Sequence, residues 1–262
     1  MPPISKPTFQ GQIAIIIPAC NEEPCLGPVL DELLAVIDPE KFVVAVGVNA
    51  SSDQTAEIAR SRGVWVAETS QRGYGYGCQS AIDLLIAAAP PVRAYIFFAG
   101  DGASDPRDLA RLVEASEQGH VFVLGARTGL VRNWRTMHFS HVIANFAVAL
   151  WCGLLAGRWF KDLAPLRLID RRLFEAIAPR EMTFGWTIEP QIAAARLGAS
   201  IREVPASERP RLAGTQKVSG VTWRRTFVIG CRILAAGWRA RLRFRGAQSI
   251  EPALLAQPHR SA

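Results

Sequence analysis

The chain has 262 residues, 49% of them hydrophobic, which is enough for one large α/β domain with a full core. The sequence opens without a charged and apolar leader, its longest apolar run (142–156) is shorter than the roughly 20 residues of a membrane span, and its five cysteines are scattered without zinc-binding spacing. These features argue against an exported, disulfide-bonded or membrane-spanning protein. They predict a cytoplasmic chain in which residues 142–156 form a buried helix.

The formal net charge of +7 is unevenly distributed along the chain. Residues 209–250 contain ten Lys or Arg and no Asp or Glu. A basic block of this kind predicts an anionic partner on one face, such as pyrophosphate, lipid headgroups or nucleic acid. Nucleic acid is the least favoured of these, because the block has no nucleic-acid-binding motif and no aromatic stacking platform.

Short β-branched runs alternate with segments of helical spacing along the first hundred residues. Strands are expected at 13–18, 42–48, 64–67 and 95–98. Helices are expected at 28–36, 55–60 and 78–88. This alternation predicts an α/β fold with a mostly parallel, doubly wound, Rossmann-like sheet flanked by helices, in which ligands bind beyond the carboxyl ends of the strands.

Polar or glycine-rich loops follow the predicted strands. Asn21, Glu22 and Glu23 come directly after the first strand, and residues 49–55 close the second. Their side chains suit either a nucleotide or the capping of a helix, so both interpretations stand. Residues 72–77 (RGYGYG) offer backbone N–H groups and one arginine, which suits either a phosphate cradle or a plain glycine loop.

Read together and in order, these segments resemble a known family. The segments IAIIIPACNEE, VNASSDQTAEIAR, QRGYGYG and FFAGDGASDP are similar to the opening half of family 2 glycosyltransferases of the dolichyl-phosphate sugar synthase type. KDLAPLR, FGWTIEPQ and RPRLAGTQKVSG agree with the second half, so the resemblance covers roughly residues 13–236. It implies a GT-A fold and inverting transfer of a sugar from a nucleotide-sugar donor to a phosphate-bearing acceptor. Polyprenyl phosphate is the first candidate for that acceptor, and a small phosphate such as phosphoglycerate is the second.

The resemblance also implies site residues. Those of the donor nucleotide and its diphosphate fall on Pro18, Asn21, Glu22, Asn49, Arg72, Gly73 and Asp101. Those of the acceptor side and the catalytic step fall on Asp162, Arg167, Trp186, Glu189, Gln191, Arg211 and Lys217. Asp101→Asn and Lys217→Ala are each expected to abolish transfer without unfolding the protein.

The sequence departs from the family pattern at the metal-binding motif. Ala99 replaces the first carboxylate, so Asp101 remains as the predicted ligand of Mg²⁺ or Mn²⁺, together with substrate phosphates. Alternatively, cationic side chains neutralise the diphosphate; the candidates are Arg72, Arg127, Arg211 and Lys217. The altered motif, and Val48 where the family often has Asp, also leave open a catalytically inactive protein that only binds nucleotide-sugars or regulates.

Two acidic residues are candidates for a general base. Asp162 and Glu189 could each activate a hydroxyl acceptor, whereas a phosphate acceptor is already anionic and needs no base. Alternatively, Asp162 forms a structural ion pair with Arg167, and Glu189 pairs with Arg196 or Arg202 on the surface.

The C-terminal segment has the pattern of a basic amphipathic helix. Apolar side chains recur at helical spacing at Trp223, Phe227, Cys231, Leu234, Trp238 and Leu242. Arginines occupy the opposite side at 225, 232, 239 and 243. Such a helix either lies on an anionic membrane as a peripheral contact or packs over the domain. We therefore divide the chain into an N-terminal tail (1–12), a GT-A domain (13–220), the helical segment (221–247) and a loose tail (248–262).

Overall fold

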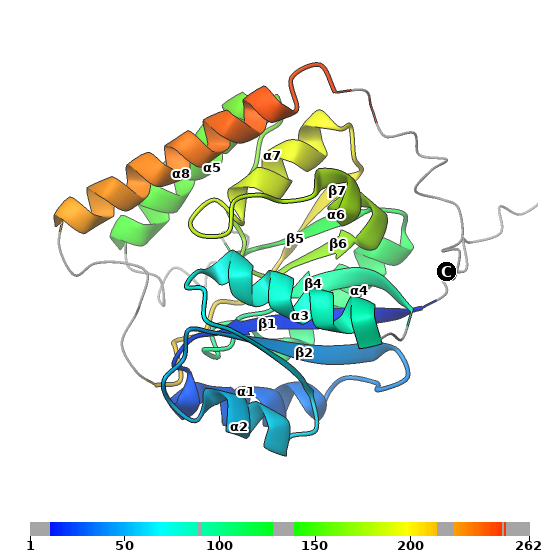
Figure 1. The fold of residues 1–262 in the computed structure, drawn as a ribbon. Helices are drawn as coiled ribbons and strands as arrows, with labels where there is room; N and C mark the ends of the chain where they lie inside the picture. The colour runs from blue at the N-terminus through cyan, green and yellow to red at the C-terminus, as the bar shows by residue number, and fades with distance from the viewer. Residues whose placement is uncertain (1–10, 89–90, 128–138, 214–222, 248, 250–262) are drawn as a thin grey trace, which may run out of the picture.

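The computed structural model describes residues 11–88, 91–127, 139–213, 223–247 and 249. Its centre is a seven-stranded sheet in the order β3-β2-β1-β4-β6-β5-β7 (Figure 1). The strands are β1 (Gln12–Ala19), β2 (Phe42–Asn49), β3 (Trp65–Thr69), β4 (Val92–Phe97), β5 (Phe122–Ala126), β6 (Arg167–Asp170) and β7 (Ile201–Pro205). Only β6 runs antiparallel to its neighbours β4 and β5, so the predicted, mostly parallel sheet is confirmed.

Helices cover both faces of the sheet. One face packs on α1 (Glu23–Leu34), α2 (Thr55–Ser61) and α4 (Leu109–Glu117), and receives the odd-numbered isoleucines of β1 (Ile13, Ile15, Ile17). The other face packs on α3 (Tyr74–Ala88), α5 (Phe139–Ala156), α6 (Arg171–Ile177) and α7 (Ile188–Arg196), and receives Ala14 and Ile16. This double burial explains why β1 is apolar from Ile13 to Ala19, as expected of a central parallel strand.

The loop formed by the glycine-rich segment before α3 is shorter than the sequence predicts. We expected a loop as far as residue 77, but α3 already begins at Tyr74. Gly47 in β2 permits this, because a Cβ there would lie 1.8 Å from the carbonyl oxygen of Gly77. The first turn of α3 is therefore pressed against the carboxyl end of β2.

The long apolar helix α5 is only partly buried. Ala149, Cys152 and Leu155 enter the core, whereas Phe146 and Leu154 are 52% and 67% exposed. The expectation of a fully buried helix is therefore wrong for one side of α5. Among the described residues, no helix has both the length and the apolar character needed to cross a bilayer.

The last helix, α8 (Trp223–Arg243), packs against α5 and α7 (Figure 1). It contacts them through a narrow side on which Ala236 and Ala240 are buried. The predicted apolar side, by contrast, points away from the domain, since Leu234, Trp238 and Leu242 are 42–51% exposed. An outward apolar side disfavours simple packing over the domain as the role of these residues. The proposed division into a domain and a helical segment stays a prediction.

Candidate active site

The loops after β1 and β2 are joined to each other at the carboxyl edge of the sheet. Asn21, with a φ of 53°, donates from its backbone N–H to the Ser51 hydroxyl (2.9 Å) and accepts from the Ser52 N–H through its side-chain oxygen (2.8 Å). The next N–H, of Glu22, donates to the Thr55 hydroxyl at 2.9 Å. The Asn21 side-chain oxygen therefore ties the two loops together, and base recognition by this residue stays a prediction.

The beginning of α3 closes the same corner. A Cβ on Gly77 would lie 2.9 Å from the side-chain oxygen of Asn49 and 3.1 Å from the Pro18 side chain, so these predicted nucleotide residues are neighbours. Just before the helix, Gly73 adopts a φ of 155°, and Arg72 is exposed. Pro18 and Asn49 thus lie together at the carboxyl ends of β1 and β2, beside the first turn of α3.

Two acidic side chains of the crevice meet one cation. The guanidinium of Arg211 contacts the carboxylate of Glu22 through one nitrogen and that of Asp101 through another, the latter at 3.1 Å. Asp101 also accepts from the Ala103 N–H at 3.1 Å, which fixes its rotamer. Glu22 belongs to the first motif, Asp101 to the altered metal motif and Arg211 to the basic loop, so the fold brings three separately predicted residues into direct contact.

These carboxylates suit a hard divalent cation. Glu22 and Asp101 both reach the same positively charged group, so oxygens of both can face a single cation, and carboxylate oxygens are the ligands that Mg²⁺ and Mn²⁺ prefer. Nowhere in the described ranges does a group of three or more His, Cys, Asp or Glu form that could hold a metal alone. Substrate phosphates would have to complete the coordination.

A second charged cluster lies beside the first. Asp162 is fully buried and accepts from Arg127 three times, from the backbone N–H (2.8 Å) and from two guanidinium nitrogens (2.9 Å each). Burial opposes the charge of Arg127, but the hydrogen bonds that Arg127 donates to Asp162, together with the negative charges of Asp162 and Glu208, outweigh it and raise the pKa of this guanidinium. Burial also raises the pKa of Glu208, which lies 3.4 Å from Arg127 and is influenced by Asp101.

This arrangement changes the interpretation of Asp162. The alternative of a structural ion pair is what the structure shows, but the partner is Arg127 rather than Arg167. Because both carboxylate oxygens are engaged, the bidentate pair competes with any role of Asp162 as a general base. Arg127 is likewise held within the protein, so its predicted contact with the donor diphosphate would require this pair to open.

Three predicted acceptor residues lie in the interior. Trp186 is 2% exposed and packs edge-on against Phe97, with ring centroids 5.8 Å apart. Arg167 donates to the carbonyls of Ala164 and Thr187, and burial lowers its pKa to about 10. Gln191 is fully buried and donates to the Asp162 carbonyl at 3.1 Å. All three side chains are buried, so a direct contact with an acceptor would require the structure to open, and their acceptor role stays a prediction.

Glu189 serves as a junction between α7 and α8. Its carboxylate accepts from the N–H groups of Arg180 and Glu181 at 2.7 and 2.8 Å, and pairs with Arg243 of α8 at 2.7 Å. The partner predicted on the surface, Arg196 or Arg202, is therefore wrong. The carboxylate is 3% exposed, and this environment suits anchoring more directly than base catalysis.

Lys217 lies outside the described residues, and its predicted role is not addressed by the structure. Sequence reasoning missed Glu208 and Glu32, which pair with Arg127 and Arg209. The only signal for them was the arginine-rich composition around residues 209–211, which requires acidic partners wherever it is buried.

Comparison with known proteins is consistent with this geometry. Residues 14–172 match the family model described as Glycosyl transferase family 2. A dolichyl-phosphate hexose transferase of Haloferax volcanii is 29% identical over 205 residues, which cover 78% of this chain and 86% of that protein. An undecaprenyl-phosphate mannosyltransferase of Micrococcus luteus is 28% identical over 230 residues, with coverages of 80% and 88%.

The fold is also shared with solved structures. Glucosyl-3-phosphoglycerate synthase from Mycobacterium tuberculosis, in complex with Mn²⁺, uridine diphosphate and glucosyl-3-phosphoglycerate, aligns with a TM-score of 0.65. The sequences are 19% identical, and the alignment covers 88% of this chain and 80% of that one. This likeness shows the GT-A fold that the sequence predicts. Because the family model matches more than half of its length, the chain belongs to glycosyl transferase family 2.

Proposed function

We propose that this glycosyltransferase moves a hexosyl group from a nucleotide-sugar donor to the phosphate of a polyprenyl phosphate, with inversion at the sugar. The observation that carries the proposal is the convergence of Glu22, Asp101 and Arg211 at the carboxyl edge of the sheet. This is the edge at which ligands bind in open α/β folds. The names of two relatives, a dolichyl-phosphate hexose transferase and an undecaprenyl-phosphate mannosyltransferase, support a lipid phosphate as acceptor.

Transfer to a phosphate does not require a general base. An oxygen of the acceptor phosphate, already anionic, forms the new bond to the anomeric carbon as the bond from that carbon to the donor diphosphate breaks. The charge that develops on the leaving nucleoside diphosphate must then be neutralised. Glu22 and Asp101 would hold a divalent cation for this purpose, and when bound it would supply electrostatic stabilisation of the diphosphate. This mechanism leaves Asp162 and Glu189 in the structural contacts described above.

Calorimetric titration with UDP- and GDP-sugars, in Mg²⁺, in Mn²⁺ and in EDTA, tests the donor half of the proposal. We expect one nucleotide class to bind, and binding to weaken by roughly tenfold or more in EDTA, since carboxylates alone repel a diphosphate. Donor binding that is unchanged by EDTA would contradict a metal-assisted site. Binding of no donor under any condition would favour the inactive alternative.

The acceptor half is tested by product analysis. Incubation of the protein and the identified donor with undecaprenyl phosphate, and separately with phosphoglycerate, distinguishes the two acceptor classes. We expect a sugar-linked lipid from the first reaction. Product only from phosphoglycerate, the compound in the names of the related solved structures, would replace the lipid with a small phosphate.

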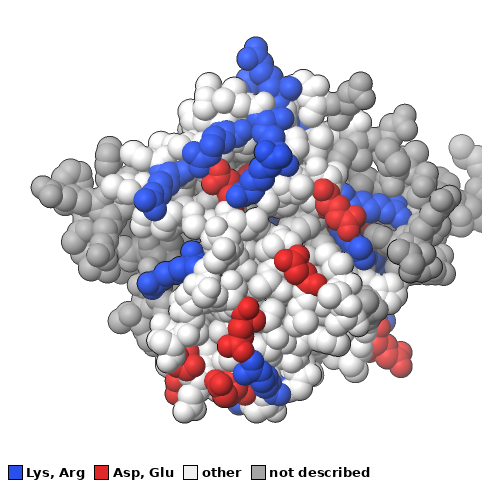
Figure 2. Space-filling model, viewed as in Figure 1, with Lys and Arg blue, Asp and Glu red and all other residues white. Residues whose placement is uncertain are grey.

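A lipid acceptor requires that the protein reach a membrane, and α8 has a surface that could contact one. Its outer stripe consists of Val228, Cys231, Leu234, Trp238 and Leu242, all of them exposed. Arginines border this stripe on both sides. Arg239 and Arg243 reach Glu181 and Glu189 on one side, and Arg241 reaches the Leu155 carbonyl of α5 on the other. Figure 2 shows Lys and Arg side chains gathered over α8.

An apolar stripe bordered by arginines is complementary to an anionic bilayer. Apolar side chains enter the acyl boundary while guanidinium groups remain at phosphate headgroups, and a tryptophan favours this boundary. Exposed Arg232 and Arg245 add further positive charge near the stripe. We therefore propose that α8 holds the protein as a peripheral contact on the inner face of the membrane, where polyprenyl phosphate is available.

The double variant Leu234→Glu/Trp238→Glu is expected to reduce binding to vesicles of phosphatidylglycerol and phosphatidylcholine by roughly tenfold or more. Flotation at low salt measures the bound fraction. Ile86→Glu on α3 is a matched control, because Ile86 is 51% exposed and lies outside α8. Equal binding by the double variant, or equal binding to vesicles of phosphatidylcholine alone, would show that α8 is not an anionic membrane contact.

A further inference from the structure

The guanidinium of Arg211 lies where two carboxylates compete for one cation. It contacts Glu22 after β1 and Asp101 after β4 through its two terminal nitrogens, and its third nitrogen, Nε, donates to the carbonyl of Ala213 at 2.7 Å. The Arg211 side chain is only 18% exposed, so solvent screens these contacts weakly. Arg211 therefore acts as a positive charge built into the crevice proposed above as the donor site.

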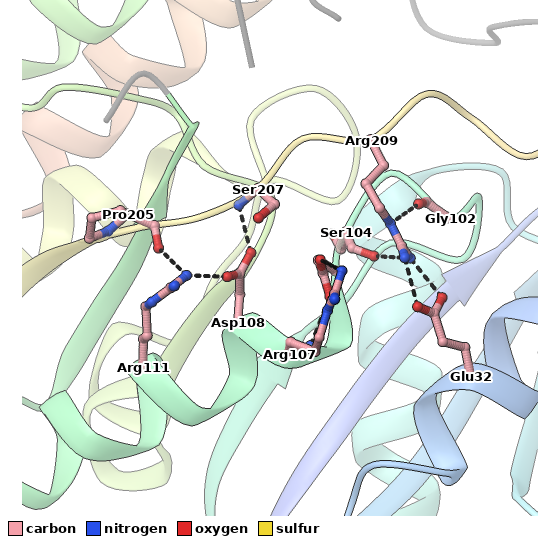
Figure 3. Close-up of polar contacts among 10 residues, drawn as sticks. Glu32, Gly102, Ser104, Arg107, Asp108, Arg111, Pro205, Ser207 and Arg209 are labelled. Atoms are coloured by element: carbon pink, nitrogen blue, oxygen red, sulfur yellow. Dashed lines mark hydrogen bonds and ion pairs between the residues drawn. The ribbon is translucent and has the colours of Figure 1, made fainter. Parts of the chain in front are cut away.

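Arg211 belongs to a crossing segment, which we define as residues 208–213. The outer part of this segment is anchored by the side chain of Arg209 (Figure 3). Arg209 pairs with Glu32 of α1 through two contacts of 2.7 and 2.8 Å, and donates to the carbonyls of Gly102 (3.2 Å) and Ser104 (2.8 Å). The Arg209 backbone N–H donates to the Ala103 carbonyl at 2.9 Å. None of these contacts involves Glu22 or Asp101.

The inner part of the crossing segment, residues 211–213, contacts the backbone at Asp101 and the thiol of Cys25. The Leu212 N–H donates to the Asp101 carbonyl at 3.1 Å, and the thiol of Cys25 donates to the Ala213 carbonyl at 3.2 Å. Gly102 has a φ of 85°, and a Cβ there would lie 2.5 Å from the Leu212 side chain. Residues 211–213 thus lie directly over the loop that carries Asp101.

The carboxylates of Glu22 and Asp101 oppose a diphosphate ligand, because like charges repel. Among the described residues, the guanidinium of Arg211 contacts both of them. A divalent cation would attract the diphosphate, but its ligand oxygens are those that Arg211 already contacts. The guanidinium and the divalent cation therefore compete for the same carboxylates.

We propose that Arg211 occupies the position of the divalent cation between Glu22 and Asp101, and that the cation displaces Arg211 when the donor binds. Without donor, Arg211 pairs with both Glu22 and Asp101 and holds residues 211–213 over the proposed donor site. A divalent cation that binds together with the diphosphate is coordinated by the two carboxylates and displaces Arg211. The inner part of the crossing segment then leaves the crevice, while Arg209 keeps the outer part on α1. This inference rests on the donor site proposed above.

Titration of Mn²⁺ without nucleotide, followed by the electron paramagnetic resonance signal of free Mn²⁺, tests the competition directly. Arg211→Gln is expected to bind Mn²⁺ about tenfold more tightly than the parent, because the competing charge-assisted hydrogen bonds are gone. Arg209→Gln is the matched control, since it removes a guanidinium from the same segment without touching Glu22 or Asp101, and its Mn²⁺ affinity is expected to equal that of the parent. Circular dichroism verifies folding of each variant.

Equal or weaker Mn²⁺ binding by Arg211→Gln overturns the exchange, and so does an absence of Mn²⁺ binding in both proteins. If the glutamine variant fails to fold, Arg211→Lys replaces it. A single ammonium group spans two carboxylates poorly, so this variant is expected to bind Mn²⁺ with an affinity above that of the parent. The Mn²⁺ titration contains no nucleotide. If it supports the exchange while calorimetry finds no donor binding, the proposed function is rejected and the exchange is not.

Hydrogen exchange provides a second readout with an internal control. In the parent protein, Mn²⁺ with a nucleoside diphosphate is expected to accelerate exchange of the Leu212 amide by about tenfold or more, while the Arg209 amide is unchanged. Both amides donate to backbone carbonyls of the same loop, at 3.1 and 2.9 Å. Equal acceleration at both positions would indicate loosening of the whole segment, and no acceleration at Leu212 would show that the segment stays in place; either result contradicts the exchange.

Discussion

Replacing Asp162 with alanine is expected to lower the free energy of unfolding by about 3–5 kcal/mol, the range found when one partner of a buried ion pair is removed. Asp162 is fully buried and accepts three hydrogen bonds from Arg127. Without it, the Arg127 guanidinium stays inside the protein with Glu208 at 3.4 Å as its remaining carboxylate contact among the described residues. The measurement is urea denaturation followed by circular dichroism.

Two further variants separate the buried pair from general effects of removing charge. Glu175→Ala breaks an exposed pair with Arg171 and is expected to change stability by less than about 0.5 kcal/mol. The double variant Arg127→Met/Asp162→Leu is expected to recover much of the loss, because the Arg127 guanidinium is removed together with its buried partner. A small effect of Asp162→Ala, similar to that of Glu175→Ala, would show that the cluster is hydrated and more open than its geometry indicates.

Asp101→Asn is expected to lower the rate of sugar transfer by roughly 10²- to 10³-fold without loss of folded structure. Asp101 is the remaining carboxylate of the altered metal motif, and its oxygens contact Arg211 and the Ala103 N–H. An amide keeps the size of the side chain but removes the charge that would hold a divalent cation against the diphosphate. The carboxylate is 28% exposed and borders the crevice, so the cost in stability is expected to be small.

The measurement is the initial rate of transfer to undecaprenyl phosphate, with the donor identified by calorimetry, beside a thermal melt of each protein. Asp83→Asn is the control for loss of one negative charge, since Asp83 is exposed on α3 and accepts a hydrogen bond from Gln79, one turn away, at 2.8 Å. Transfer by Asp101→Asn at a rate close to that of the parent would remove Asp101 from the reaction and assign the neutralisation of charge to arginines.

Much of the site could be located from the sequence because its parts follow predicted strands. Asn21, Glu22 and Asn49 come at the ends of β1 and β2, and parallel neighbouring strands bring such ends together without further information. The altered metal motif could be identified in the same way, since Asp101 follows β4, the other neighbour of β1. Local periodicity and the order of the motifs were sufficient for these predictions.

The roles of individual side chains were harder to predict because they depend on partners far along the chain. Arg211 meets Asp101 across 110 residues and Glu22 across 189 residues. Arg127 and Asp162 are 35 residues apart, and Arg243 reaches Glu189 across 54. In each case the sequence shows a charge, and the path of the chain selects the opposite charge that neutralises it.

By itself, the sequence determined the alternation of strands and helices, the mostly parallel sheet, the family and the edge of the sheet at which the candidate site residues gather, since hydrophobic period and motif order are local properties. The tertiary structure decided which charges are paired, whether Trp186 and Arg167 face a ligand or the core, and which side of α8 faces outward. Helical spacing identifies an apolar side, but only the packing of α8 on α5 and α7 through Ala236 and Ala240 leaves that side exposed. Burial and pairing are properties of the assembled chain, because each depends on segments that the sequence places far apart.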